Sequence, residues 1–181
     1  MTNSKYFFLA ILASSLFFTS CDDDDNLDGG PGEPELITTV ELTFTESGNS
    51  STFTVTDPDG DGGNAPVAET IQLEADKTYT VTARFLDESD ANDVEDITEE
   101  VSEEADEHLV CYTATGELSA PTTTDTDSAG DALGLAATVS TTEAGSGTLM
   151  VVLKHQPDKA STTPCSTGDT DVEVTFPVEI Q

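Results

Sequence analysis

Short segments in which apolar and polar residues alternate run through this chain from residue 36, and they constrain its fold more than any other feature. In residues 36–46, Val40, Leu42 and Phe44 fall on one face and mainly threonines on the other. Similar segments, separated by Gly, Asp and Pro, occupy residues 52–56, 70–74, 78–86, 109–115, 117–124, 133–142, 148–155 and 171–180. A period of two with Thr and Val enrichment indicates half-buried strands. We therefore predict an all-β domain, an antiparallel Ig-like β-sandwich of eight or nine strands, with 133–142 and 148–155 forming a hairpin.

One acidic segment, residues 87–108, interrupts this pattern. Val94, Ile97 and Val101 recur there at helical spacing, so we expect a partly helical insertion with a short helix opening at residues 98–101. Continued as a helix, the segment would place Glu100, Glu104 and His108 on one face. The many carboxylates repel one another, which suggests that something compensates them.

The N-terminus has the pattern of an export signal. Lys5 precedes an apolar run at residues 6–18, which is too short to span a bilayer but suits a secretory signal peptide. Residues 18–21, Phe-Thr-Ser-Cys, resemble a bacterial lipobox, with Phe18 where Leu is usual. We predict a lipoprotein signal peptide at 1–20, a lipidated Cys21, an acidic Gly/Pro linker at 21–34 and the β-domain at 35–181; the alternative is an ordinary signal peptide with a chance cysteine.

The charge balance limits the possible partners. The 181 residues contain 5 Lys+Arg and 37 Asp+Glu, a net charge of −32, and removal of residues 1–20 with Lys5 makes it −33. Such a chain repels phosphates, which excludes nucleic acid as a partner, and it is discouraged from anionic lipid. A bound partner is expected to be cationic or to present a basic patch.

Two groups of residues are candidate metal sites. Asp57, Asp59 and Asp61 with Gly62 match the opening half of a calcium loop, although the closing acid at position 68 is Ala and the flanks are strands, so an EF-hand is excluded. The same residues are also ordinary turn formers.

The second candidate site combines the acidic segment with the two histidines, His108 and His155, since imidazole with carboxylate suits zinc or another divalent transition metal. If nine strands alternate in direction, both histidines and the Asp57 loop lie on one rim; without the segment 117–124 as a strand, His155 moves to the opposite rim. Glu100 and Glu104 would then complete a site with His108. The alternative is that the carboxylates are simply solvated and the histidines incidental.

Cys111 and Cys165 remain once Cys21 is lipidated, and an even pair in an oxidising compartment suggests a disulfide. Cys111 could equally be a small buried residue in the apolar stretch 110–112. The sequence has no nucleophile elbow, no His-Glu-x-x-His zinc motif and no phosphate loop, and it has no Trp, so we expect that the protein is not an enzyme.

Several motifs together resemble a family of small Bacteroidota surface lipoproteins that are often labelled as type 1 periplasmic-binding-fold proteins. The motifs are residues 57–66, 85–88, 95–101, 104–108, 153–159 and 169–176. That label implies a large two-lobed α/β fold, for which this chain is too short and too rich in β-segments. The resemblance implies an accessory lipoprotein that works with a TonB-dependent outer-membrane receptor.

These observations lead to one preferred function and one alternative. We expect a non-enzymatic lipoprotein, anchored in the outer membrane and facing the cell exterior, that binds a small cationic ligand for uptake. A divalent metal bound near His108 and His155 is the expected ligand. The alternative is a structural or adhesive surface module stabilised by calcium at the Asp57 loop, without a transported ligand.

Overall fold

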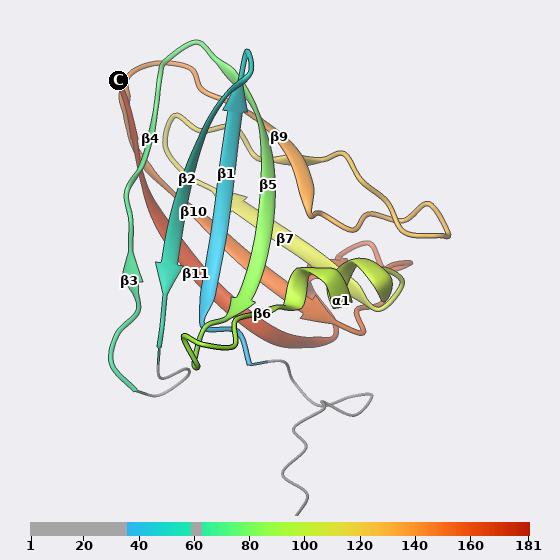
Figure 1. The fold of residues 1–181 in the computed structure, drawn as a ribbon. Coiled ribbons are helices and arrows are strands. Elements are labelled where there is room, and N and C mark those ends of the chain that lie inside the picture. The colour runs from blue at the N-terminus through green and yellow to red at the C-terminus, as the bar shows by residue number, and fades with distance from the viewer. Residues whose placement is uncertain (1–35, 59–62) are drawn as a thin grey trace, which may run out of the picture.

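The computed structural model of the chain describes residues 36–58 and 63–181, and most of the regular structure in that part is β-strand in two sheets (Figure 1). Sheet A has the order β3-β2-β1-β5-β9-β8, with β6 paired to β5; its strands are β1 (Thr39–Glu46), β2 (Asn49–Thr56), β3 (Val67–Ala68), β5 (Thr78–Asp87), β6 (Glu95–Asp96), β8 (Thr122–Thr123) and β9 (Ala136–Ser140). Sheet B has the order β4-β11-β10-β7; its strands are β4 (Ile71–Leu73), β7 (His108–Ala114), β10 (Gly145–His155) and β11 (Asp169–Ile180). The strands pair antiparallel, apart from the parallel pair β4–β11. The predicted all-β, mainly antiparallel fold is confirmed.

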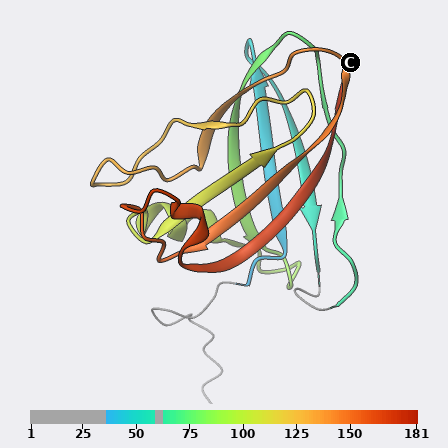
Figure 2. The same ribbon diagram turned by 180° about the vertical axis from the view of Figure 1, so that it is seen from behind.

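The core lies between the two sheets. Val40, Leu42 and Phe44 on β1 are buried, as their alternation predicts, and they belong to the same apolar cluster as Leu149 and Val151 on β10. Sheet B lies behind sheet A in Figure 1 and in front of it in Figure 2, with β7, β10 and β11 running obliquely to β1 and β5. None of the helices in the described residues has the length and apolar character needed to cross a bilayer.

The predicted hairpin of residues 133–142 and 148–155 is wrong. β9 pairs with β5 and β8 in sheet A, whereas β10 pairs with β7 and β11 in sheet B. The connection passes from one sheet to the other because Thr142 is held elsewhere: its carbonyl accepts a hydrogen bond from the Asp76 N–H, and its own N–H donates to the Glu117 carbonyl. Both strands still turn their apolar residues into the shared core, which is why they have the same sequence pattern.

The acidic insertion contains one short helix, α1 (Ile97–Glu103). The Asp96 side chain caps it by accepting a hydrogen bond from the Thr98 N–H, and Ile97 and Val101 bury its inner face. The expectation of a helical face that continues to His108 is wrong, because the helix ends at Glu103 and the chain turns before His108 begins β7. No basic residue lies in the last turn to favour its extension through so many carboxylates.

The segment between β10 and β11, residues 156–168, folds back over the outer face of sheet B and includes a 3₁₀ turn, η1 (Pro164–Ser166) (Figure 2). A disulfide joins Cys111 on β7 to Cys165 in this segment. Under it lies a small second apolar cluster of Leu109, Cys111 and Val152. Because the segment connects His155, the last residue of β10, to Asp169, the first residue of β11, the disulfide anchors the end of β10 and the start of β11.

Candidate metal centre

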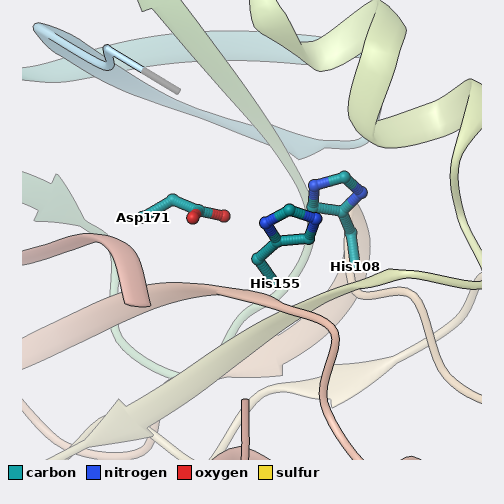
Figure 3. A group of neighbouring side chains, drawn as sticks. All are labelled: His108, His155 and Asp171. Carbon is teal, nitrogen blue, oxygen red and sulfur yellow. The ribbon is translucent and has the colours of Figure 1, made fainter. Parts of the chain in front are cut away.

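His108 and His155 face each other where sheet B ends. His108 is the first residue of β7, His155 is the last residue of β10, and the two are direct partners in the antiparallel ladder. Both belong to the inward-facing set of their strands, in phase with the buried Val110 and Leu153. Their rings stack with centroids 4.9 Å apart and an interplanar angle of 7° (Figure 3). The ladder therefore brings the chain's two histidines together at one edge of the core.

Asp171 joins the pair because the register of β11 shifts at this point. Leu153 is paired with Val172 and Lys154 with Thr170, so Asp171 is an extra residue in β11. In an uninterrupted ladder Asp171 would stand opposite Lys154, on the outer side of the sheet. The bulge lets its carboxylate turn towards the two rings instead, as Figure 3 shows. One ligand atom from each of His108, His155 and Asp171 lies within 4.8 Å of the other two.

The carboxylate of Asp171 is buried without compensation. Both of its oxygens are shielded from solvent and have no hydrogen-bond partner among the described residues. Burial raises the pKa of this carboxyl group above its ordinary value, against the opposing effect of the nearby His155 and His108. Buried polar atoms are nearly always hydrogen-bonded, so two such oxygens in one side chain make Asp171 a candidate ligand for a cation.

His108 is held in an orientation that suits a metal ligand. The side chain is buried, and its Nδ1 lies 3.2 Å from the carbonyl oxygen of Glu104. Because that carbonyl can only accept a hydrogen bond, Nδ1 carries the proton in this contact and Nε2 is left as the free lone-pair donor. A histidine that donates its other nitrogen to a backbone carbonyl is the usual support of a metal-binding imidazole. Glu104 thus contributes its backbone to the site.

The arrangement needs a modest adjustment to enclose an ion. A tetrahedral zinc ion at ~2.05 Å from its ligands places them about 3.3 Å apart, closer than the 4.8 Å within which the three atoms now lie. An imidazole lone pair also lies in the ring plane, so two parallel rings cannot both point at one ion. Rotation of His155, which is less buried than His108, would tilt its ring towards Asp171 and close the group.

The structure brings together only some of the predicted site residues. His108 and His155 are in contact, but Glu100 lies on α1 and is not in the group, and Glu104 approaches through its carbonyl. Asp57 lies after β2 and lines a cavity with Asp171. Asp59 and Asp61 of the predicted calcium loop, and the predicted lipidation residue Cys21, lie outside the described residues.

Sequence reasoning missed Asp171. It is one of several acids at the start of the last strand, and strict alternation with Val172 and Val174 places it on the outer face. The available signal was local: Asp169, Thr170 and Asp171 are three polar residues before the apolar alternation of β11 begins, a composition that can accommodate a bulge.

No protein-family description, no curated protein and no solved structure shows a significant match to this chain.

Proposed function

We propose that this protein binds a divalent transition metal of the zinc type through His108, His155 and Asp171. The observation that carries the proposal is the pair of buried Asp171 oxygens that face two imidazoles and have no hydrogen-bond partner among the described residues. A bound cation would compensate the carboxylate and use the free nitrogen of each ring. Two imidazoles and one carboxylate are a known donor combination for zinc with one coordination position left open.

The donor set also selects the class of metal. Calcium and magnesium prefer six or more oxygen ligands and rarely accept imidazole, whereas zinc and its neighbours in the transition series bind imidazole well. We therefore propose zinc, or a metal with similar preferences, at the histidines. Calcium at the Asp57 loop is the ligand of the alternative function, a structural or adhesive module.

We further propose that the two-sheet domain is Ig-like and that it is carried by a lipoprotein anchored in the outer membrane through Cys21. In this role it would be a non-enzymatic accessory module that supplies metal to a TonB-dependent receptor on the cell surface. The export pattern at residues 1–21 and the family resemblance support this assignment. Cys21→Ala should abolish incorporation of labelled fatty acid and release the protein from the membrane fraction; lipid labelling that persists in this variant contradicts the anchor.

The metal proposal is tested by calorimetry on the purified protein after it has been stripped with chelator. We expect one zinc ion per chain at physiological salt, and a loss of affinity of about 100-fold or more in His108→Ala and in Asp171→Asn. Glu173→Gln is the matched control, because Glu173 is an exposed acid two residues away on the same strand, is paired with Val152 and lies outside the group. Zinc affinity that is equal in all four proteins would overturn the site.

A further inference from the structure

Asp169, the first residue of β11, lies beside the metal-binding group. It is the direct ladder partner of His155, which is in turn the direct partner of His108. Direct partners in an antiparallel ladder carry their side chains on the same face of the sheet, with Cβ atoms about 4.5–5.5 Å apart. Asp169, His155 and His108 therefore form one row across the inner face of sheet B, where the sheet ends.

The bulge in β11 leaves a second carboxylate on the same face. Asp171 follows Asp169 two residues later, and its side chain also points to the two histidine rings (Figure 3). Burial is the largest cause that raises the pKa of the Asp171 carboxyl group, and the negative charge of Asp169 raises it further. The two carboxylates are thus close enough to interact, and a cation between them would relieve their repulsion.

Asp169 differs from the three members of the group in its exposure. His108 and both carboxylate oxygens of Asp171 are buried and His155 is half-buried, whereas Asp169 is exposed. Its carboxylate lies outside the set of ligand atoms that are within 4.8 Å of one another, so it must turn inwards to reach an ion. Because the side chain is exposed, such a change of rotamer does not disturb the core.

The backbone that carries Asp169 is held in place. The preceding residue, Gly168, has φ +69° and packs so closely on the carbonyl group of His155 that a Cβ has no room there. The disulfide between Cys111 and Cys165 anchors the same segment three residues earlier. Asp169 therefore combines a fixed backbone with an exposed side chain, as a ligand that opens and closes the site requires.

The charge balance of the centre also favours a second carboxylate. Two neutral imidazoles and the Asp171 carboxylate would leave a zinc ion with one uncompensated positive charge at the edge of an apolar core, which is costly. The Asp169 carboxylate would bring the net charge to zero. The ion pairs among the described residues are formed by Lys77, Arg84 and Lys159, and none of them includes Asp169.

We propose that Asp169 is the fourth ligand of the metal centre and the one through which the ion enters and leaves. This inference rests on the proposed function and deepens it. The exposed carboxylate meets the ion first, turns inwards with it, and fills the coordination position that His108, His155 and Asp171 leave open. Release reverses these steps, so Asp169 controls how fast the ion is given up. A closed shell of four protein ligands is typical of zinc sites without catalytic activity.

The first test replaces zinc by cobalt(II), whose visible spectrum reports its coordination, and uses azide as an external ligand. In the wild-type protein the four protein ligands leave no position for azide, so we expect that azide does not change the cobalt spectrum. Asp169→Ala should still bind cobalt, and azide should enter the vacated position and change the spectrum. Glu173→Gln is the matched control, an exposed acid of the same strand outside the group, and it should behave like the wild type.

The second test measures zinc affinity and, by stopped flow, the rate at which zinc passes to an excess of chelator. Asp169→Asn should lower the affinity about 10-fold or more and speed release several-fold, whereas Glu173→Gln should change neither. An azide response in the wild type, or an affinity and release rate unchanged in Asp169→Asn, would overturn the role of Asp169 and leave the three-residue metal centre intact. A wild-type protein that binds neither cobalt nor zinc would overturn the metal centre itself, and the role of Asp169 with it.

Discussion

Asp171 faces His155 because β11 contains one residue more than β10 between the pairs Leu153–Val172 and Lys154–Thr170. The bulge converts an outward position into an inward one and leaves a carboxylate at the edge of the core without a hydrogen-bond donor among the described residues. Such an arrangement lowers the stability of the metal-free protein, and binding of a cation would recover it. The proposed metal binding requires the Asp171 carboxylate, whereas the metal-free protein would be more stable without its charge.

Asp171→Asn should stabilise the metal-free protein at neutral pH while removing zinc binding. The substitution replaces a buried, uncompensated charge by a neutral amide of nearly the same shape, and we expect a gain of about 1 kcal/mol, or ~2–4 °C in melting temperature. Thermal unfolding in the presence of chelator measures it. Glu173→Gln, at an exposed position of the same strand, should change the melting temperature by less than ~1 °C. A melting temperature lower than that of the wild type for Asp171→Asn would show that the carboxylate is already compensated.

Gly168→Ala should disturb the metal centre from the connecting segment. Gly168 has φ +69°, and a Cβ placed there would lie 2.3 Å from the His155 carbonyl oxygen, so the end of β10 must move. Gly130 is the matched control: it has φ +90°, but no atom lies within 4 Å of the position of its Cβ. We expect Gly130→Ala to cost only the backbone strain, about 1–2 kcal/mol, and to leave zinc affinity unchanged. Gly168→Ala should cost more and reduce zinc affinity several-fold; equal effects on zinc in both variants would contradict this.

The alternation of Thr with Val, Leu and Phe was enough to predict the all-β class and most strand positions. The alternation could not predict which strands pair with each other, because the inward-facing residues of both sheets pack in the same core. Val139 on β9 and Leu149 on β10 have the same pattern, yet they belong to different sheets. What separates them is the set of backbone hydrogen bonds around Thr142, which involve Asp76 and Glu117 and have no sequence signature.

Only the part of the candidate site that lies at the ends of strands could be predicted from the sequence. His108 and His155 occupy the first and last residues of strands that the alternation reveals, so a common rim could be considered. The sequence places Glu100 in the site only if α1 continues to His108. The helix instead ends at Glu103, because mutual repulsion of the acidic side chains opposes its extension. Asp171 depends on a bulge, which reverses the side that alternation assigns to it.

Loss of the disulfide should destabilise the protein without changing the fold of the core. Cys111 and Cys165 are 54 residues apart, and closing a loop of that length in the unfolded chain corresponds to about 4 kcal/mol of stabilisation. Urea denaturation should show this loss for the Cys111→Ala/Cys165→Ala double variant, and reductant should lower the midpoint of the wild type but not of the variant. Unchanged wild-type stability under reductant, with free thiols verified, would contradict the prediction.

The ion pair of Lys159 with Asp127 should make stability depend on pH in the acid range. The side chains are almost fully buried, and Lys159 Nζ lies 2.9 Å from Asp127 Oδ2 and 2.6 Å from the Ala105 carbonyl oxygen. The hydrogen bond from Lys159 is the largest cause that lowers the pKa of the Asp127 carboxyl group below its ordinary value. The pair thereby joins the segment 156–168 to the turn after α1 and to the loop before β9.

A carboxyl group whose pKa is lower in the folded than in the unfolded state stabilises the protein fully above the unfolded pKa, near 3.9, and loses this contribution as the pH falls through the folded pKa. Lys159→Met should therefore lower the urea midpoint at pH 5–7, with a melting temperature lower by roughly 5 °C or more, and the difference from the wild type should shrink below about pH 4. Lys77→Met is the control, because Lys77 forms only exposed ion pairs at 3.4 and 4.0 Å, and it should have little effect at any pH. A deficit of Lys159→Met that stays constant from pH 7 to pH 2.5 would show that Lys159 stabilises the protein through packing and its bond to Ala105 alone.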